Sequence, residues 1–182
     1  ISALLLMAPG LINGLEVELQ GMVTSIPYIK MTLALLSDLG VDYKWTDNII
    51  KIAPKKDIID TLMTVESDWS SASYFYSLVA LSEKGNVSLS SYKKDSLQGD
   101  SSLIAIYKHF GVTTRFDNDR IILEKETSNP GPLKLDLVGS PDLAQTIAVT
   151  CFGMSTQIKS DPRRIYLLSS CQSFGRVPDY NI

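Results

Sequence analysis

Histidine and cysteine are scarce in this chain of 182 residues, which holds one histidine, His109, and two cysteines, Cys151 and Cys171. A structural zinc site needs about four closely spaced ligands of these types, and a disulfide framework needs more cysteines. His109 lies just before Gly111 at the end of an expected helix, where a cation stabilises the helix dipole. Neither cysteine has the basic neighbours that activate a thiol. These counts disfavour zinc, disulfide and thiol chemistry, and favour a reducing, cytoplasmic compartment.

Other common signatures are also missing. The chain has no Gly-x-Gly-x-x-Gly run and no Walker-type phosphate loop, so neither kind of nucleotide site is indicated. No uncharged apolar run approaches the roughly 18–20 residues that cross a bilayer. Lysine and arginine number 17 against 20 aspartates and glutamates, giving a net charge of -3. A nucleic-acid binder needs a basic face, so we expect neither a nucleic-acid nor a membrane partner.

The chain does contain enough apolar residues for a globular protein, 45% of the total, and an internal repeat of helix, strand, helix and hairpin. The first copy is predicted at 1–8, 14–19, 27–36, 41–45 and 49–52. The second copy is predicted at 68–78, 86–90, 99–107, 113–116 and 121–123, with Asp68 as a helix N-cap. A third copy begins with a strand at 133–137 and a helix at 141–149. Such a repeat predicts stacked units that share buried faces.

Several motifs resemble the EPSP synthase family, the enolpyruvyl transferases of the shikimate pathway. Four segments carry the resemblance in register: Ser25–Thr32 (Ser-Ile-Pro-Tyr-Ile-Lys-Met-Thr), Val65–Phe75 (Val-Glu-Ser-Asp-Trp-Ser-Ser-Ala-Ser-Tyr-Phe), Ser96–Asp100 (Ser-Leu-Gln-Gly-Asp) and Pro141–Ala148 (Pro-Asp-Leu-Ala-Gln-Thr-Ile-Ala). The resemblance implies an α/β fold of repeated βαβαββ units, arranged in the complete protein as two domains.

The same resemblance divides the chain. Residues 1–66 would be the last part of the first repeat domain, and residues 67–153 the first part of the second. Residues 154–182 are expected to form an irregular or divergent tail. An uncapped apolar start at Ile1 also suggests an internal fragment of a longer protein, whose complete form we expect to be monomeric.

The family transfers the enolpyruvyl group of phosphoenolpyruvate to the 5-hydroxyl of shikimate 3-phosphate and releases phosphate, without a metal or organic cofactor. By resemblance, Asp142 is the catalytic carboxylate that contacts shikimate hydroxyls and accepts a proton. Ser25 would bind the phosphate of shikimate 3-phosphate, and Tyr28 would line the shikimate pocket. We expect Ser25 and Asp142 to line opposite walls of one crevice. From position alone, Asp142 would instead be read as a helix N-cap.

Other polar residues within these motifs have a structural interpretation. Glu66 and Asp68 lie at the expected domain crossover, where capping of the next helix and hinge contacts explain them. Ser70, Ser71 and Ser73 are small residues suited to close helix packing, and no ligand is assigned to them.

The chain also departs from the family. A Ser-Ser-Gln triplet that binds both substrates belongs immediately before Ile1, and the elements that clamp phosphoenolpyruvate lie outside the matched segments. After Gly153 a Lys-Glu-Thr-Asp-Arg motif is expected, but Thr156–Ile165 reads Thr-Gln-Ile-Lys-Ser-Asp-Pro-Arg-Arg-Ile. Lys159 and either Arg163 or Arg164 are the candidate remnants. We therefore expect this segment alone to lack turnover.

Two alternatives remain open. One is the related UDP-N-acetylglucosamine enolpyruvyl transferase, which the Ser-Ile-Pro-Tyr motif at Ser25–Tyr28 disfavours. The other is a non-catalytic module of βαβαββ repeats, in which Asp142 is only a helix cap.

Overall fold

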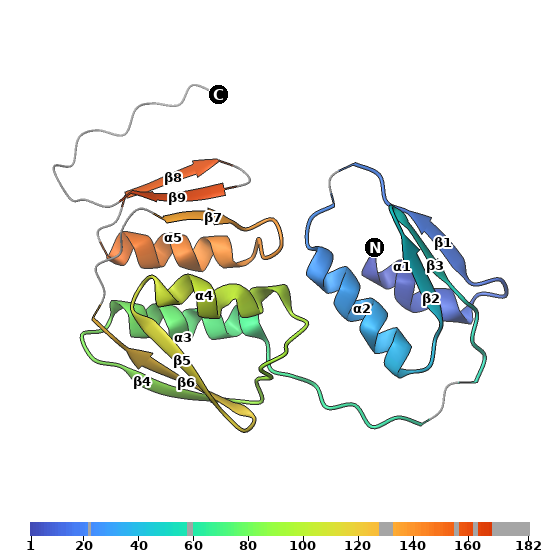
Figure 1. Cartoon of the computed structure of the whole chain (residues 1–182), viewed down its shortest axis with the longest axis horizontal. Helices are drawn as coiled ribbons and strands as arrows, with labels where there is room; N and C mark the ends of the chain where they lie inside the picture. The colour runs from blue at the N-terminus through green and yellow to red at the C-terminus, as the bar shows by residue number, and fades with distance from the viewer. Residues whose placement is uncertain (22, 58–59, 128–132, 155–156, 162–163, 169–182) are drawn as a thin grey trace.

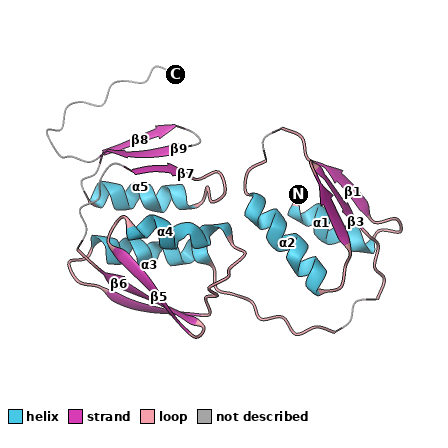
Figure 2. Ribbon diagram, viewed as in Figure 1, coloured by secondary structure: helices cyan, strands magenta, loops and turns pink. Residues whose placement is uncertain are grey.

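The structure is a computed structural model that describes residues 1–182 except 22, 58–59, 128–132, 155–156, 162–163 and 169–182. Helices and small antiparallel sheets form two groups that lie side by side (Figure 1). We call the elements from α1 to β3 the first lobe and those from α3 to β9 the second lobe. The ribbon in Figure 2 shows helices packed on one face of the sheets in both lobes. This mixed architecture confirms the predicted α/β repeat class.

The first lobe holds one copy of the repeat. Its elements are α1 (Ser2–Met7), a 3₁₀ turn η1 (Ala8–Gly10), β1 (Leu15–Glu18), α2 (Ile26–Asp38), β2 (Tyr43–Thr46) and β3 (Ile49–Ile52). The strands form an antiparallel sheet in the order β1-β3-β2. Its core includes Leu5 from α1, Leu33 from α2 and Ile50 from β3. Helix α2 begins with Pro27 in its first turn, where the missing N–H of proline costs nothing.

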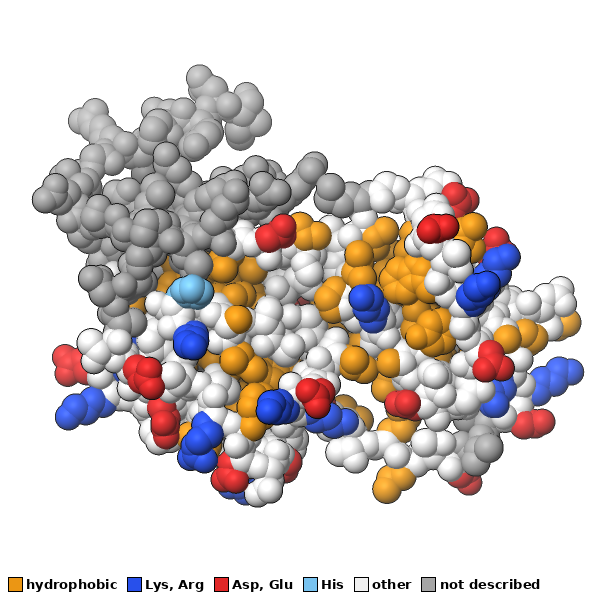
Figure 3. Space-filling model, viewed as in Figure 1, with side chains coloured by type: hydrophobic (Ala, Val, Ile, Leu, Met, Phe, Trp, Pro, Cys, Tyr) orange, Lys and Arg blue, Asp and Glu red, His pale blue; other side chains and the backbone are white. Residues whose placement is uncertain are grey.

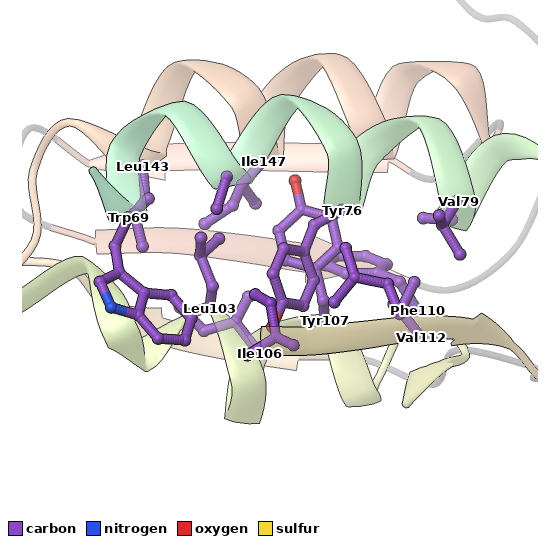
Figure 4. Close-up of a cluster of buried hydrophobic side chains, with 14 of the residues drawn as sticks. Trp69, Tyr76, Val79, Leu103, Ile106, Tyr107, Phe110, Val112, Leu143 and Ile147 are labelled. Atoms are coloured by element: carbon purple, nitrogen blue, oxygen red, sulfur yellow. The ribbon is translucent and has the colours of Figure 1, made fainter. Parts of the chain in front are cut away.

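The second lobe repeats this order. Its first copy comprises α3 (Trp69–Leu81), β4 (Asn86–Ser90), a 3₁₀ turn η2 (Gly99–Ser102), α4 (Leu103–Lys108), β5 (Val112–Asp117) and β6 (Arg120–Lys125). The strand order β4-β6-β5 matches that of the first lobe. Trp69, Tyr76, Tyr107 and Phe110 are fully buried between the helices and this sheet (Figure 4). These large aromatic side chains supply much of the apolar area removed from water.

The two hairpins turn in the same way. Asp47 has a φ of 53° between β2 and β3, and Asn118 has a φ of 55° between β5 and β6. Aspartate and asparagine tolerate the left-handed region better than most residues, so both hairpins form where the sequence predicted them.

A third group consists of β7 (Leu133–Asp136), α5 (Leu143–Gly153), β8 (Gln157–Asp161) and β9 (Arg164–Leu168), with strand order β7-β9-β8. Strands β8 and β9 lie inside the region 154–182, which the sequence predicted to be irregular or divergent. Strand β9 pairs both with the adjacent β8 and with β7, a partner distant in sequence that local patterning does not reveal. Residues 169–182 and Arg163 lie outside the described residues, while Lys159 and Arg164 lie on β8 and β9.

Helices α3 and α5 pack closely through small polar residues. The Ser73 and Thr146 hydroxyls lie 3.0 Å apart, and Thr150 Oγ1 donates to Ser77 Oγ at 2.8 Å. The Tyr107 hydroxyl joins this buried network 2.9 Å from Thr150 Oγ1. Each buried hydroxyl thus finds a partner, which offsets its loss of water. The predicted packing role of Ser73 is confirmed.

The two lobes have separate cores, one formed by residues between Leu5 and Ile52 and the other by residues between Trp69 and Cys151. The proposed boundary near Glu66 falls between them and stays a prediction. None of the described helices has the length and apolarity to cross a membrane. On the face drawn in Figure 3, acidic and basic side chains are interspersed over both lobes.

Candidate active site at the junction of the two lobes

The start of α2 meets the second lobe through backbone contacts. The Ser25 N–H donates to the carbonyl oxygen of Val138 at 3.1 Å, which joins the first lobe to the loop that precedes α5. Pro27 lies against Gly99 in η2 and near Gly139 in the same loop. The loop is held to η2 by Ser140, whose hydroxyl lies 3.3 Å from that of Ser102. Two segments selected by sequence motifs, around Ser25 and before α5, therefore adjoin.

Ser25 is the N-cap residue of α2, but its hydroxyl makes no capping hydrogen bond. Its backbone is left-handed, with φ 58° and ψ 34°. That conformation costs an L-residue about 1–2 kcal/mol. The bond from Ser25 N–H to Val138 helps to hold this unfavourable geometry. A half-buried serine hydroxyl thus lies ahead of a helix N-terminus, where the positive end of the helix dipole favours an anion.

Tyr28 lies in the first turn of α2 and reaches the second lobe. Its hydroxyl interacts with the side chains of Ser70, in the first turn of α3, and Asp100, in η2. Burial, followed by the negative charge of Asp100, raises the pKa of Tyr28 to about 12, and the charge of Asp142 adds to the effect. The phenol is therefore neutral at physiological pH and able to donate a hydrogen bond.

Asp142 stands at the N-terminus of α5, yet it does not cap that helix. Its backbone is already helical, with φ -66° and ψ -22°, and its carboxylate makes no capping hydrogen bond. The side chain is exposed, and its charge acts on both Tyr28 and Asp100. Plain capping thus does not account for Asp142. The carboxylate remains open to solvent or a ligand at the lobe junction.

Asp100 is a residue of this junction to which the sequence assigned no role. It is fully buried, with a relative exposure of 0%, and accepts a hydrogen bond from the Ser70 hydroxyl through Oδ2. Its other oxygen, Oδ1, has no hydrogen-bond partner among the described residues. Burial is the main reason that the pKa of Asp100 is raised, and the charges of Asp142 and Asp68 act in the same direction. The motif Ser96–Asp100 marked this segment, but nothing in it signals burial.

Glu66 holds the crossover segment in place, as the sequence predicted. Its Oε1 accepts from Trp69 Nε1 and from the Lys93 N–H, both at 2.8 Å. Its Oε2 accepts from the Ser96 hydroxyl at 2.8 Å and from Gln98 Nε2 at 3.3 Å. With its lone pairs occupied by protein donors, Glu66 acts as a structural anchor.

Asp68 caps α3, as predicted. Its carboxylate accepts from Ser70 N–H at 2.9 Å and from Ser71 N–H at 3.2 Å. The Ser71 hydroxyl adds a third bond at 2.6 Å. These bonds, chiefly that from the Ser71 side chain, lower the pKa of Asp68.

Two described surface pockets lie away from this junction. One of about 340 Å³ lies along the β2–β3 hairpin, and one of about 450 Å³ lies beside the crossover, between Glu66 and Asp119. Neither includes Ser25 or Asp142, so a crevice shared by these two residues stays a prediction. Among the described residues no group of histidine, cysteine and carboxylate side chains is arranged to hold a metal ion.

Comparisons with known proteins identify relatives along most of the chain. Residues 1–160 match the sequence model of the family described as EPSP synthase (3-phosphoshikimate 1-carboxyvinyltransferase). A 3-phosphoshikimate 1-carboxyvinyltransferase from Bacteroides fragilis strain YCH46 is 41% identical over 151 residues, covering 83% of this chain and 37% of the relative. One from Methanosphaera stadtmanae is 34% identical over 155 residues, with coverage of 82% and 36%.

A solved EPSP synthase from Acinetobacter baumannii shares the fold, with a TM-score of 0.59 at 16% identity over 93% of this chain and 45% of that one. The chain thus spans a little over a third of the length of the relatives it matches in sequence. The family match over residues 1–160 includes the junction segments around Ser25, Tyr28 and Asp142. On this evidence the chain belongs to the EPSP synthase family.

Proposed function

We propose that this chain contributes to an enolpyruvyl transferase that moves the enolpyruvyl group of phosphoenolpyruvate to the 5-hydroxyl of shikimate 3-phosphate. The reaction is taken from the names of the relatives, and one structural observation supports assigning it to this chain. Asp142 is exposed and free of any capping bond at the junction that also contains Ser25 and Tyr28. A carboxylate, an uncommitted hydroxyl and a neutral phenol suit a phosphorylated polyol.

In this proposal Asp142 acts on the attacking hydroxyl. The hydroxyl oxygen forms a bond to C2 of phosphoenolpyruvate while its proton passes to the Asp142 carboxylate, and the methylene carbon gains a proton. Elimination then breaks the bond between C2 and the phosphate oxygen, releases phosphate and restores the carbon–carbon double bond by loss of a methyl proton. A well-placed general base contributes typically about 10²–10⁴-fold to the rate.

Ser25 and Tyr28 hold shikimate 3-phosphate in this proposal. The Ser25 hydroxyl and the positive end of the α2 helix dipole suit the 3-phosphate. The Tyr28 ring offers a flat apolar surface for the carbocycle. Its hydroxyl stays protonated because its pKa is about 12, so the phenol adds no negative charge beside an anionic ligand.

We further propose that the 182 residues bind shikimate 3-phosphate without turning it over. The Ser-Ser-Gln triplet and the phosphoenolpyruvate clamp implied by the family resemblance are not among these residues. The proposed reaction needs no metal or organic cofactor. We also propose that the complete protein has two domains, divided near Glu66, and works as a cytoplasmic monomer.

Calorimetric titration with shikimate 3-phosphate tests the binding site. The wild-type chain is compared with Asp142→Ala and with Asp38→Ala, which removes an exposed carboxylate from the far end of α2. We expect Asp142→Ala to weaken binding at least about tenfold, equivalent to about 1.4 kcal/mol, and Asp38→Ala to leave it unchanged. Equal affinities for all three chains would assign Asp142 a role outside ligand binding.

Two further measurements separate the alternatives. Binding of UDP-N-acetylglucosamine in preference to shikimate 3-phosphate would favour the related transferase. A coupled phosphate-release assay should record no turnover by the 182-residue chain. Turnover at a rate typical of a complete enzyme would contradict the proposal that the clamp residues are needed.

A further inference from the structure

The junction contains a buried carboxyl group that the proposed reaction does not use. Among the described residues, Asp100 is the only charged residue that is fully buried, and its Oδ1 has no hydrogen-bond partner among them. An ionised carboxylate in such a place is costly because it has lost water without full replacement. Its position between the lobes therefore calls for a reason other than stability.

Asp100 lies beside two hydroxyl groups, those of Ser70 and Tyr28, at the contact between the two lobes. The Ser70 hydroxyl, on α3, donates to Asp100 Oδ2, and the Tyr28 hydroxyl, on α2, interacts with both Ser70 and Asp100. Two of these groups belong to the second lobe, and the third belongs to the first. The η2 turn that carries Asp100 also packs against Pro27, one residue before Tyr28. Both the side chain and the backbone of this segment thus contact the first turn of α2.

We propose that Asp100 is a positioning residue that, with Ser70, fixes the Tyr28 hydroxyl at the lobe junction and so sets the orientation of the tyrosine ring toward substrate. The inference rests on the proposed role of Tyr28 in binding shikimate 3-phosphate. Asp100 does not touch the reacting atoms; it acts through Tyr28.

We expect the protonation state of Asp100 to affect this arrangement. When Asp100 is neutral, its carboxyl group can donate as well as accept a hydrogen bond, beside the Ser70 and Tyr28 hydroxyls. When Asp100 is ionised, its buried negative charge lies near two other carboxylates, Asp142 at the N-terminus of α5 and Asp68 at the start of α3. Tyr28 on α2 is the other titratable group that acts on it. Both carboxylates favour the protonated form. Burial, the largest cause, also raises the pKa of Asp100.

Three variants of the 182-residue chain test the role of Asp100. Asp100→Asn keeps a neutral group of the same shape that can donate and accept, Asp100→Ala removes the contact, and Tyr28→Phe removes the hydroxyl on the other lobe. The first measurement needs no ligand: amide hydrogen exchange at Ser25, whose N–H bonds to Val138 across the junction. The Leu19 amide, bonded to Asn48 O within the first lobe, serves as the internal control.

We expect Asp100→Ala and Tyr28→Phe to speed exchange at Ser25 by about tenfold or more, without changing Leu19, because only the junction opens more often. Asp100→Asn should behave like wild type. If Asp100→Ala does not fold, Ser70→Ala takes its place with the same expectation. Unchanged exchange at Ser25 in these variants would overturn the inference.

The second measurement is the affinity for shikimate 3-phosphate as a function of pH. The ratio of the wild-type affinity to the Asp100→Asn affinity should fall as the pH rises and Asp100 ionises. Ionised Asp100 no longer holds the Tyr28 hydroxyl in the same way, whereas asparagine does not titrate. Asp100→Ala should bind about tenfold more weakly at every pH. A packing role alone would lower stability but leave this pH difference at zero, which would overturn the inference.

The two proposals fail in different ways. If the wild-type chain binds no shikimate 3-phosphate but Ser25 exchange responds as expected, the link between lobes stands and the proposed substrate is wrong. If the ligand binds and the Asp100 variants change neither exchange nor affinity, the substrate stands and the positioning role is wrong.

Discussion

Gly99 approaches the backbone of Gly139 so closely that no side chain fits at position 99. A Cβ atom built on Gly99 would lie 2.5 Å from the carbonyl oxygen of Gly139 and 3.1 Å from Cβ of Pro27. A Cβ on Gly139, by contrast, would meet only Pro27, at 3.8 Å or more. The two glycines therefore respond differently to the same substitution, although they face each other across one contact.

Gly99→Ala should destabilise the junction by about 1–3 kcal/mol, because a clash with backbone cannot be relieved by a side-chain rotation. Gly139→Ala is the matched control, with an expected change within about 0.5 kcal/mol. Urea unfolding of both variants gives the comparison. Equal stability of the two would show that η2 and the loop before α5 can separate at little cost.

Ser25→Gly should raise stability while it weakens ligand binding. Glycine adopts φ near +58° without the steric cost that serine bears, which stabilises the fold by up to about 1 kcal/mol. The same change removes the hydroxyl proposed to contact phosphate. Thermal unfolding and calorimetric titration with shikimate 3-phosphate measure the two effects.

Ser25→Ala is the control for this prediction, since it deletes the hydroxyl but keeps the strained backbone. It should weaken binding without the gain in stability. A stabilised Ser25→Gly variant with undiminished affinity would remove Ser25 from the proposed phosphate site.

Asp68→Ala should cost about 1 kcal/mol of unfolding free energy, because two N–H groups of α3 lose their cap. The lowered pKa of Asp68 fixes the sign of the pH dependence: the stabilisation is present above its ordinary value of 3.8 and is lost as pH falls through the depressed pKa in the folded state. Asp68→Asn should keep the cap but lose this acid sensitivity. Urea titrations at neutral and acidic pH distinguish the three chains.

Glu66→Ala should destabilise the second lobe by about 1–3 kcal/mol, because it leaves donors on Trp69, Lys93, Ser96 and Gln98 without their acceptor. Glu66→Gln retains the shape but replaces one acceptor oxygen with a donor, so it should recover only part of the loss. Tryptophan fluorescence during urea unfolding follows the change, since the Trp69 indole N–H is one of the partners. A neutral effect of Glu66→Ala would contradict the anchoring role.

Cys151 should resist alkylation until the chain unfolds. It has 0% exposure, and burial raises the pKa of its thiol to about 12, so almost no thiolate is present at about pH 8. Iodoacetamide labelling followed by mass spectrometry of the peptide that contains Cys151 measures the rate. Labelling in denaturant is the control, and rapid labelling of the native chain would contradict the packing of α5.

Features that depend on neighbouring residues could be predicted from the sequence. The Asp68 cap, the strand Asn86–Ser90 and both hairpins appear where expected, because capping, alternation and turn formation act within a few residues. The expected single helix at 99–107 divides into η2 and α4. Its start, Gly99–Ser102, contains glycine and two serines, which have low helix propensity.

Features that depend on distant segments could not be predicted in this way. Asp100 is buried where η2 meets α2, α3 and the loop before α5, and no periodic pattern around it signals that. Strand β9 likewise pairs with a segment distant in sequence, β7. The motifs selected Ser25, Tyr28 and Asp142, whereas position alone favoured a helix cap at Asp142, and its carboxylate makes no capping hydrogen bond.

The order of strands has a consequence for synthesis of the chain. In each of the three sheets the central strand, β3, β6 or β9, is the last of its three to leave the ribosome. The two outer strands form no hydrogen bonds with each other, so each sheet can form only after its central strand has been synthesised. The backbone amides of a nascent chain should therefore become protected from hydrogen exchange in three abrupt steps. Each step occurs when one short central strand emerges, and protection does not increase gradually with chain length.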